Sequence, residues 1–196
     1  MARDTTPVMG LRERSKARRR EAILRAAYEL FAQRGFEATT VADIAEVAEV
    51  APRTVRIYFP SKLDMALTHF SAFADRLGTA LRQREGETLE AVERWLHAEI
   101  AHRTDLDELT YRMLEANPNL QAACTARLAG VIRVGTHAIA QERGEDPEGF
   151  VPRMVAVAAA VVINALGARP GEADIAAAMA FLRGGLSAIP PIPGSA

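Results

Sequence analysis

The chain has 196 residues, 49% of them hydrophobic, and a formal net charge of −1 at pH 7. That length accommodates one large domain, or a small domain joined to a larger one. The single cysteine, Cys124, excludes an intrachain disulfide, and the longest apolar run, residues 154–168, is too short to cross a bilayer comfortably. Because the N-terminus lacks the apolar run of a signal peptide, we expect a cytoplasmic protein.

Charge is divided unevenly along the chain. Up to Lys62 there are 12 Lys and Arg against 8 Asp and Glu, whereas the residues after it carry 12 against 17. Seven basic and two acidic residues fall within the first 20 positions. This asymmetry predicts a polyanionic partner for the N-terminal part and a different role for the remainder.

The N-terminal part predicts a flexible arm followed by three helices. Residues 1–15 are polar and basic, and apolar side chains recur at helical spacing from Lys16 onward. A capping box at residues 40–43, Thr-Val-Ala-Asp, opens a short second helix. A third helix starts at Pro52, since proline is tolerated at the first helical position, and Pro60 ends it.

The remainder is also helical in pattern, so the predicted fold class is all-α, with about nine helices and no sheet. A second capping box, from Ser61 to Asp64, opens a long fourth helix. Further helices are expected over residues 88–103, 105–116, 118–144, 147–166 and 172–186. Residues 188–196 are rich in proline and are expected to form a disordered tail.

The stretch VAPRTVRIYFPSK contains the third helix and predicts two different faces. Val55 and Phe59, four residues apart, can face a small core, while Arg53, Arg56 and Ile57 share another face. An arginine can donate two hydrogen bonds to guanine, and an isoleucine can contact the methyl group of thymine. A tight connection between two short helices therefore predicts a helix-turn-helix whose second helix enters the major groove.

The segment TTVADIAEVAEVAPRTVRIYFPSKLDMAL, preceded by AILRAAYELFAQRGFEATT, resembles the DNA-binding domain of the tetracycline-repressor (TetR) family over about residues 20–68. The resemblance implies an all-helical homodimer. Residues 16–62 would form a three-helix DNA-binding domain, and residues 63–187 a larger helical domain that binds an effector and dimerises. The expected function is a ligand-responsive repressor that an effector releases from an inverted-repeat operator. The alternative is a DNA-binding regulator whose C-terminal domain is a dimerisation or partner scaffold without a ligand.

Three positions depart from the family pattern. Glu49 stands at the turn where glycine is usual, and a weaker turn with a positive φ at this residue is the expected cost. Ala51 replaces the usual serine at the start of the recognition helix, so the hydroxyl cap is lost, although Pro52 presets the helical φ. Arg56 replaces the usual aromatic residue. These departures predict a shifted operator preference.

Carried over by position, the family's DNA contacts fall on Thr40, Arg53, Thr54, Tyr58 and Lys62, and side-chain chemistry adds Arg56. Two alternatives stay open, because Tyr58 could be a core tyrosine and Arg56 could form a salt bridge with Glu46 or Glu49. The basic stretch RERSKARRR could reach the phosphate backbone or the minor groove, or could remain a solvated polybasic segment.

The resemblance also implies an effector cavity in the helices after Leu63. Its apolar character suggests a hydrophobic or amphipathic effector, and neither a cofactor nor a metal ion is expected. The candidate lining residues are Phe70, Phe73, Trp95, Tyr111, Met113, Leu114 and Leu120. Each of them could instead be an ordinary core residue, because aromatic and methionine side chains at helical spacing are common in cores.

The last two helices, with the sequences MVAVAAAVVINALGA and ADIAAAMAFL, consist almost entirely of small apolar residues. One chain cannot bury both in so thin a layer, so we expect a four-helix interface with a second copy. The alternative is an intrachain hairpin packed on the rest of the domain.

An enzyme is not expected. His97 and His102 lie five residues apart, which does not bring two imidazoles to one metal as the spacing of zinc proteases does. The sequence also lacks a Gly-rich phosphate loop and a nucleophile elbow. Cys124 is expected to be a buried thiol rather than a redox sensor.

Overall fold

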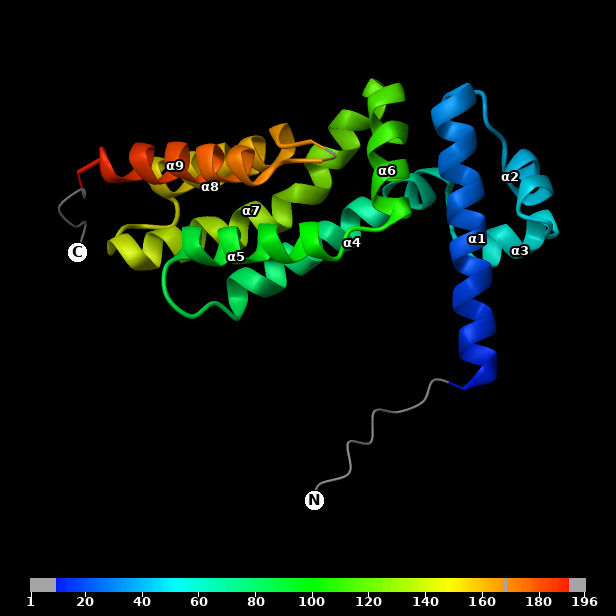
Figure 1. The fold of residues 1–196 in the computed structure, drawn as a ribbon, viewed down its shortest axis with the longest axis horizontal. Helices are drawn as coiled ribbons and strands as arrows, with labels where there is room; N and C mark the ends of the chain where they lie inside the picture. Colours follow the sequence, from blue (N-terminus) through cyan, green and yellow to red (C-terminus); the bar gives the residue numbers. More distant parts are fainter. Residues whose placement is uncertain (1–9, 168, 191–196) are drawn as a thin grey trace, which may run out of the picture. The chain divides into compact units, whose positions relative to one another are not determined.

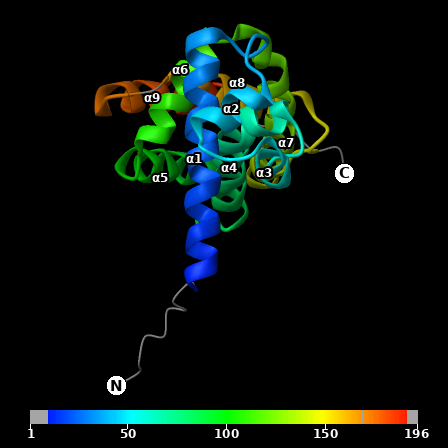
Figure 2. The same cartoon turned by 90° about the vertical axis from the view of Figure 1, so that its right-hand side faces the viewer.

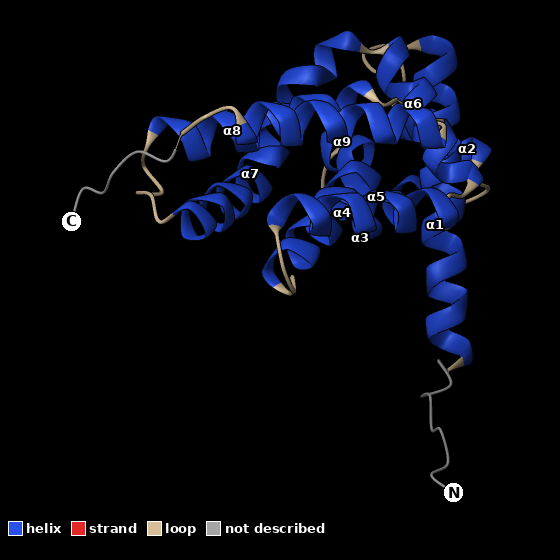
Figure 3. Cartoon of the chain, turned by 60° about the vertical axis from the view of Figure 1, so that its left-hand side comes forward, coloured by secondary structure: helices blue, strands red, loops and turns tan. Residues whose placement is uncertain are grey.

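The computed structural model describes residues 10–167 and 169–190, and in these ranges the chain is helical with no strand (Figure 3). The all-α prediction is therefore confirmed. The helices are α1 (Leu11–Arg34), α2 (Val41–Val47), α3 (Pro52–Tyr58), α4 (Lys62–Arg82), α5 (Thr88–Ala101), α6 (Asp105–Ala116), α7 (Gln121–Arg143), α8 (Phe150–Ala165) and α9 (Glu172–Ser187). A single 3-10 turn, Pro118–Leu120, precedes α7.

The chain divides into two compact units (Figure 1). The N-terminal unit comprises the residues up to Ala66 together with Arg112–Asn117, and the C-terminal unit comprises Leu67–Tyr111 and the residues from Pro118 onward. The sequence places the boundary at Lys62, where α4 begins. The division between the two compact units falls between Ala66 and Leu67, and the Tyr28 hydroxyl of α1 donates to the Met65 carbonyl in the first turn of α4 at 3.2 Å.

Helix α1 buries an apolar face in the core of the N-terminal unit. Ile23, Ala27 and Phe31 are fully buried along one face, as the helical spacing predicts. The helix begins at Leu11, before the Lys16 start that the sequence indicates, so the last residues of the expected 1–15 arm are helical. Residues 1–9 of that arm lie outside the described residues. Helix α2 lies against both α1 and α3 (Figure 2).

The end of α6 belongs to the N-terminal unit because Asn117 joins it to the end of α1. The Asn117 side chain is 4% exposed. Its amide nitrogen donates to the carbonyl oxygens of Phe31 at 2.9 Å and Met113 at 2.7 Å, and its oxygen accepts the Phe36 N–H at 2.5 Å. A short polar side chain thus supplies hydrogen-bond partners to backbone groups at the ends of two helices.

The C-terminal unit has a core built from five helices, α4, α5, α7, α8 and α9. Trp95 and Leu96 of α5, Ile163 of α8, and Ile175 and Met179 of α9 are among its buried members. Helix α8 runs beside both α7 and α9 (Figure 1). Of the expected Pro-rich tail, 188–196, only residues 188–190 are described, and there Arg143 donates to the carbonyl oxygens of Ile189 and Pro190.

Candidate nucleic-acid interface

Helix α2 begins at the capping box that the sequence predicts. The Thr40 hydroxyl oxygen accepts the Asp43 N–H at 3.2 Å, and an Asp43 carboxylate oxygen accepts from both the Thr40 N–H and its hydroxyl at 2.7 Å. Hydrogen bonds from the Thr40 side chain, and then from its backbone, hold the pKa of the Asp43 carboxyl below its ordinary value. This cap leaves Thr40 exposed at the N-terminal end of α2, where free N–H groups favour an anion.

The turn between α2 and α3 is tight, as a helix-turn-helix requires. Glu49 has a φ of 53°, so the position does adopt the left-handed conformation expected where the family usually has glycine. The Val50 N–H donates to the Ala45 carbonyl at 2.9 Å and closes the turn. Ala51 caps α3 without any side-chain hydrogen bond, and Pro52 is the first helical residue. Both departures in this turn therefore have the predicted structural consequences.

Helix α3 buries one face and exposes the other. Val55 and Phe59 are 0% and 3% exposed, whereas Ile57 is 78% exposed. Arg53 and Arg56 are exposed on the same side as Ile57, and neither has an ion-pair partner among the described residues. The alternative pairing of Arg56 with Glu46 or Glu49 is accordingly not formed. Two guanidinium groups and one large apolar side chain are thus left open to a partner.

Thr54 and Tyr58 lie beside this exposed face and are half-buried. The buried aromatic residue here is Phe59, the C-cap of α3, and the centre of its ring lies 5.0 Å from the Arg20 guanidinium. Tyr58 is therefore not a core tyrosine. Arg20 comes from the basic stretch predicted as an arm, so in the structure one arginine of that stretch packs on an aromatic ring of the helix-turn-helix.

Lys62 has a structural role that the sequence did not reveal. Its ammonium donates to the carbonyl oxygens of Phe36 at 2.7 Å, Thr39 at 3.1 Å and Glu37 at 3.4 Å. It also lies 4.3 Å from the centre of the Phe36 ring. The three N–H groups of a lysine are thus directed at the connection between α1 and α2. The expected contact of Lys62 with DNA stays a prediction.

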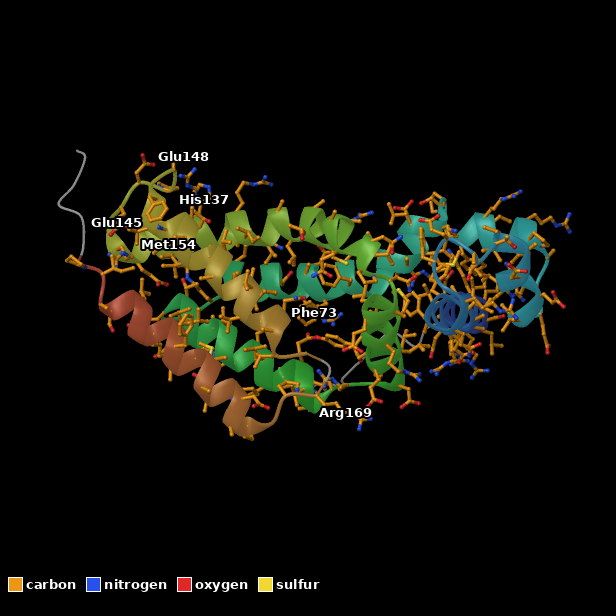
Figure 4. All side chains as sticks on the ribbon, turned by 90° about the horizontal axis from the view of Figure 1, so that it is seen from above. Phe73, His137, Glu145, Glu148, Met154 and Arg169 are labelled. Atoms are coloured by element: carbon orange, nitrogen blue, oxygen red, sulfur yellow. The ribbon has the colours of Figure 1, made fainter. Side chains whose placement is uncertain are left out.

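The expected effector residues are only partly gathered. Phe73, which is labelled in Figure 4, packs edge-on against Trp95 with ring centroids 4.8 Å apart, and the ring centroid of Phe70 lies 6.4 Å from that of Phe73. Tyr111 lies under Arg103 at 5.8 Å, and burial raises the pKa of its hydroxyl. The remaining three do not share this cluster: Met113 and Leu114 belong to the N-terminal unit, and Leu120 is buried in the 3-10 turn.

Trp95 carries a buried polar atom without a partner. The residue is 6% exposed, and its indole Nε1 has no hydrogen-bond acceptor among the described residues. Buried donors are nearly always paired, so an unpaired one needs an explanation such as a bound molecule. A cleft of about 570 Å³ lies elsewhere in the C-terminal unit, between α4 and α7, and none of the expected effector residues lines it.

Several titratable groups of the C-terminal unit are paired with a carboxylate or buried. Within the described ranges no three His, Cys, Asp or Glu side chains are grouped so that they could hold a metal ion. His69 and His97 are each paired with a carboxylate, Asp107 at 2.6 Å and Glu172 at 3.5 Å. Cys124 is buried, and burial raises the pKa of its thiol. No helix in the described ranges has the length and apolarity to span a membrane.

The geometry of α2 and α3 defines a helix-turn-helix DNA-binding protein, and comparisons with known proteins agree. Residues 23–68 match the family of bacterial regulatory proteins called tetR, and residues 110–189 match the C-terminal domain described for MftR. The transcriptional regulator TcmR of Streptomyces glaucescens is 34% identical over 165 residues, which cover 78% of this chain and 73% of that protein.

Solved structures show the same fold. Salmonella enterica GusR superimposes with a TM-score of 0.64 at 19% identity, over 87% of this chain and 96% of its own. Thermus thermophilus FadR, a TetR-family repressor solved with lauroyl-CoA, gives a TM-score of 0.53 at 22% identity, over 90% and 100%. This chain therefore belongs to the TetR family and is a DNA-binding transcriptional regulator.

Proposed function

We propose that the protein is a homodimeric repressor that leaves an inverted-repeat operator when a small apolar or amphipathic effector binds. The observation that carries the DNA-binding part is the exposed face of α3, with Arg53, Arg56 and Ile57 open to a partner. An isoleucine that is exposed on the same face as two arginines stabilises nothing within the chain, which supports a role for this face in binding a partner.

The DNA-contacting residues divide by chemistry into two groups. Arg53 and Arg56 read guanine through paired hydrogen bonds, and Ile57 contacts the thymine methyl. Thr54 and Tyr58 on α3 and Thr40 at the start of α2 carry hydroxyls that contact phosphates, and such contacts set the register without reading sequence. Lys62 supports the interface indirectly, by holding the loop that precedes Thr40.

The dimer forms through α8 and α9. Four apolar side chains, Phe150, Met154, Val157 and Val161, recur along one face of α8 and are 68%, 36%, 47% and 63% exposed. Phe181 on α9 is 66% exposed. An apolar stripe of this length on two adjacent helices is rarely left in water. A second copy that packs against the same stripe buries these apolar side chains. The resulting twofold dimer also matches the twofold symmetry of an inverted repeat.

The effector site is proposed at the Phe70, Phe73 and Trp95 cluster. The unpaired Trp95 indole N–H supplies a donor for an oxygen of the bound molecule, and the aromatic rings supply apolar surface. Thermus thermophilus FadR, which was solved in complex with lauroyl-CoA, supports the proposal of an amphipathic effector. Effector binding then favours a spacing of the two recognition helices that no longer matches successive major grooves, about 34 Å apart.

Selection of bound sequences from random duplex DNA tests the proposal. Purified protein, first unfolded and refolded to remove any bound molecule, should enrich an inverted repeat with half-sites about one helical turn apart. An Arg25→Ala variant, altered on α1 away from the α3 face, should enrich the same repeat. If the folded protein enriches no sequence, or a half-site without symmetry, the operator-binding dimer is wrong.

A further inference from the structure

Helix α1 extends well beyond the core that it helps to form. Its first buried residue is Ile23, and all of residues 11–22, which we call the α1 extension, are exposed. At a rise of about 1.5 Å per residue, the α1 extension is about 18 Å long. Figures 1 and 2 both show α1 running on past α3 toward the start of the chain. The extension is therefore a helical projection with little of the N-terminal unit packed against it.

The α1 extension carries the entire positive excess of the N-terminal part of the chain. It holds six Lys and Arg against two Glu, whereas the other residues up to Lys62 hold six basic and six acidic side chains. Without the extension, that part would have no net charge with which to attract a polyanion. Because contacts with phosphates supply most of the sequence-independent affinity for DNA, the extension is the main source of such affinity in this chain.

The basic side chains of the extension are not neutralised by the chain itself. Glu21 pairs with Arg25 at 4.0 Å, and none of the six Lys and Arg of the extension has a salt-bridge partner among the described residues. Like charges recur four residues apart, at Arg12 and Lys16 and again at Lys16 and Arg20, and such pairs destabilise a helix. An anion bound along the helix would replace this repulsion with attraction.

One row of these basic residues lies on the side of α1 that faces α3. Arg12, Lys16 and Arg20 are spaced by four and therefore share one side of the helix. Their row continues into the buried face of α1 at Ile23, which is 0% exposed. At the inner end of the row, the Arg20 guanidinium lies 5.0 Å from the centre of the Phe59 ring, at the C-cap of α3. The row then runs outward past the end of α3.

The exposed face of α3 points away from the core that α3 shares with α1. Val55 and Phe59 are buried in that core, and Arg53, Arg56 and Ile57 are exposed on the opposite side. A duplex bound by this face would lie beyond α3 as seen from α1. Past the end of α3, no part of the helix-turn-helix would stand between the duplex and the basic row.

We propose that the α1 extension binds the phosphate backbone of the duplex next to each half-site, through Arg12 and Lys16. An α-helix is about 10–12 Å across and the minor groove about 6 Å wide, so a helix cannot enter that groove as an extended arm can. Basic side chains on a helix therefore meet phosphates, which contribute affinity and position without reading sequence. Leu11, the single large apolar side chain of the extension, leaves it without an apolar face for a membrane. The inference rests on the proposed function for the operator itself.

The salt dependence of DNA binding measures these contacts. Arg12→Gln/Lys16→Gln removes two charges per subunit and keeps good helix formers in place. The slope of log affinity against log salt concentration should become shallower by about 3–4, since four phosphate contacts per dimer contribute about 0.9 each. Fluorescence anisotropy measures the slope on the selected repeat with about eight flanking base pairs on each side, which is longer than the extension at about 3.4 Å per base pair.

Arg14→Gln/Arg18→Gln is the matched control, because it removes the same charge from the other side of the same helix. Arg14 and Arg18 are in the row that continues toward Arg25, away from the buried face. This control should change the slope by less than about 1. Circular dichroism should show the same helix content and unfolding temperature for both variants. An unchanged slope for Arg12→Gln/Lys16→Gln, or equal flattening by the two variants, would overturn a contact made by one side of the helix.

The length of the duplex gives a second readout. Removing the flanking base pairs should weaken binding by the parent by about tenfold or more, because the phosphates that the extension contacts are lost. The same trimming should weaken binding by Arg12→Gln/Lys16→Gln by less than about twofold. Equal weakening of the parent and the variant would overturn a contact outside the half-site.

Failure of this inference can be told apart from failure of the proposed function. Phosphate contacts do not depend on sequence, so Arg12→Gln/Lys16→Gln should also show a shallower slope than the parent on a duplex of scrambled sequence. If no inverted repeat is enriched but this difference is found, the repressor is wrong and the extension still binds DNA. If a repeat is enriched and the parent and the variant bind it with the same slope, the repressor stands and the role of the extension is overturned.

Discussion

Lys62 and Asn117 are polar side chains whose partners are backbone groups near the connection between α1 and α2. Lys62 donates to the Phe36 and Thr39 carbonyls, and Asn117 accepts from the Phe36 N–H. Neither pairing has a signal in the sequence, because 81 residues separate Phe36 from Asn117. By contrast, the Thr40 to Asp43 cap is local, and the sequence alone predicts it.

Replacing Asn117 should lower the stability of the protein. Asn117→Ala leaves the Phe36 N–H without its acceptor and removes one donor from the Phe31 and Met113 carbonyls, which costs about 1–3 kcal/mol for a group that is left unpaired and that water does not reach. Urea unfolding monitored by circular dichroism measures the free energy of unfolding. Gln83→Ala, at an exposed amide, is the matched control and should change it by less than about 0.5 kcal/mol.

Arg53 should contribute specificity rather than general affinity. Arg53→Ala is expected to weaken binding to the selected operator by about 1–3 kcal/mol and to relax the base preference at one position of each half-site. Fluorescence anisotropy on the operator and on a scrambled duplex at one salt concentration measures both. An equal loss on the two duplexes would show that Arg53 contacts phosphate and not a base.

Helices α2 and α3 illustrate what local patterns determine at the scale of an element. Pro52, the capping box and the apolar spacing of Val55 and Phe59 place both helices and orient α3. The positive φ of Glu49 follows from its place in the turn. Only the tertiary structure shows that Arg56 forms no salt bridge with Glu46 or Glu49. An exposed salt bridge changes the free energy of folding by little, so the sequence does not decide whether it forms.

The turn at Glu49 stores strain that glycine would relieve. Glu49→Gly should raise the free energy of unfolding by about 0.5–1 kcal/mol, because the left-handed penalty exceeds the extra backbone entropy of glycine. Glu46→Gly, at a right-handed position in α2, should instead lower it by about 1 kcal/mol. Chemical unfolding of the two variants measures both, and equal signs would contradict strain at Glu49.

The cap of α2 should depend on pH through Asp43. Since the pKa of this carboxyl is lower in the folded state, its stabilisation is complete above the ordinary value of 3.8 and is lost as pH falls below it. The stability difference between the parent and Thr40→Val should therefore shrink as pH falls through this range. Thr40→Ser keeps the hydroxyl and should follow the parent at every pH; a constant difference for Thr40→Val would argue against the linkage.

At the scale of the whole molecule, the exposed stripe on α8 and α9 predicts a dimer. Val157→Lys/Val161→Lys should yield a folded monomer in sedimentation-velocity experiments and should bind the operator at least tenfold more weakly. Glu90→Lys/Arg94→Glu, at exposed positions on α5, should remain dimeric. Retained dimerisation of the lysine variant would place the interface elsewhere.

The sequence by itself determined the helical class, the helix-turn-helix with its cap, turn and buried face, and the small-residue character of α8 and α9. These features depend on contacts within a few residues, which spacing and capping residues encode directly. Only the tertiary structure decided that Lys62 binds carbonyls, that the end of α6 joins the N-terminal unit, and that the expected effector residues do not all meet.

The cleft between α4 and α7 could not be predicted from the sequence for the same reason. Arg82 and Arg133 are remote in the chain, and glycines at 78 and 130 have no periodic signal of their own. Which residues face each other across two helices depends on the packing angle and the size of side chains elsewhere in the core. The sequence pattern predicts which face of each helix is apolar, but a cleft between two helices forms only when the helices pack together.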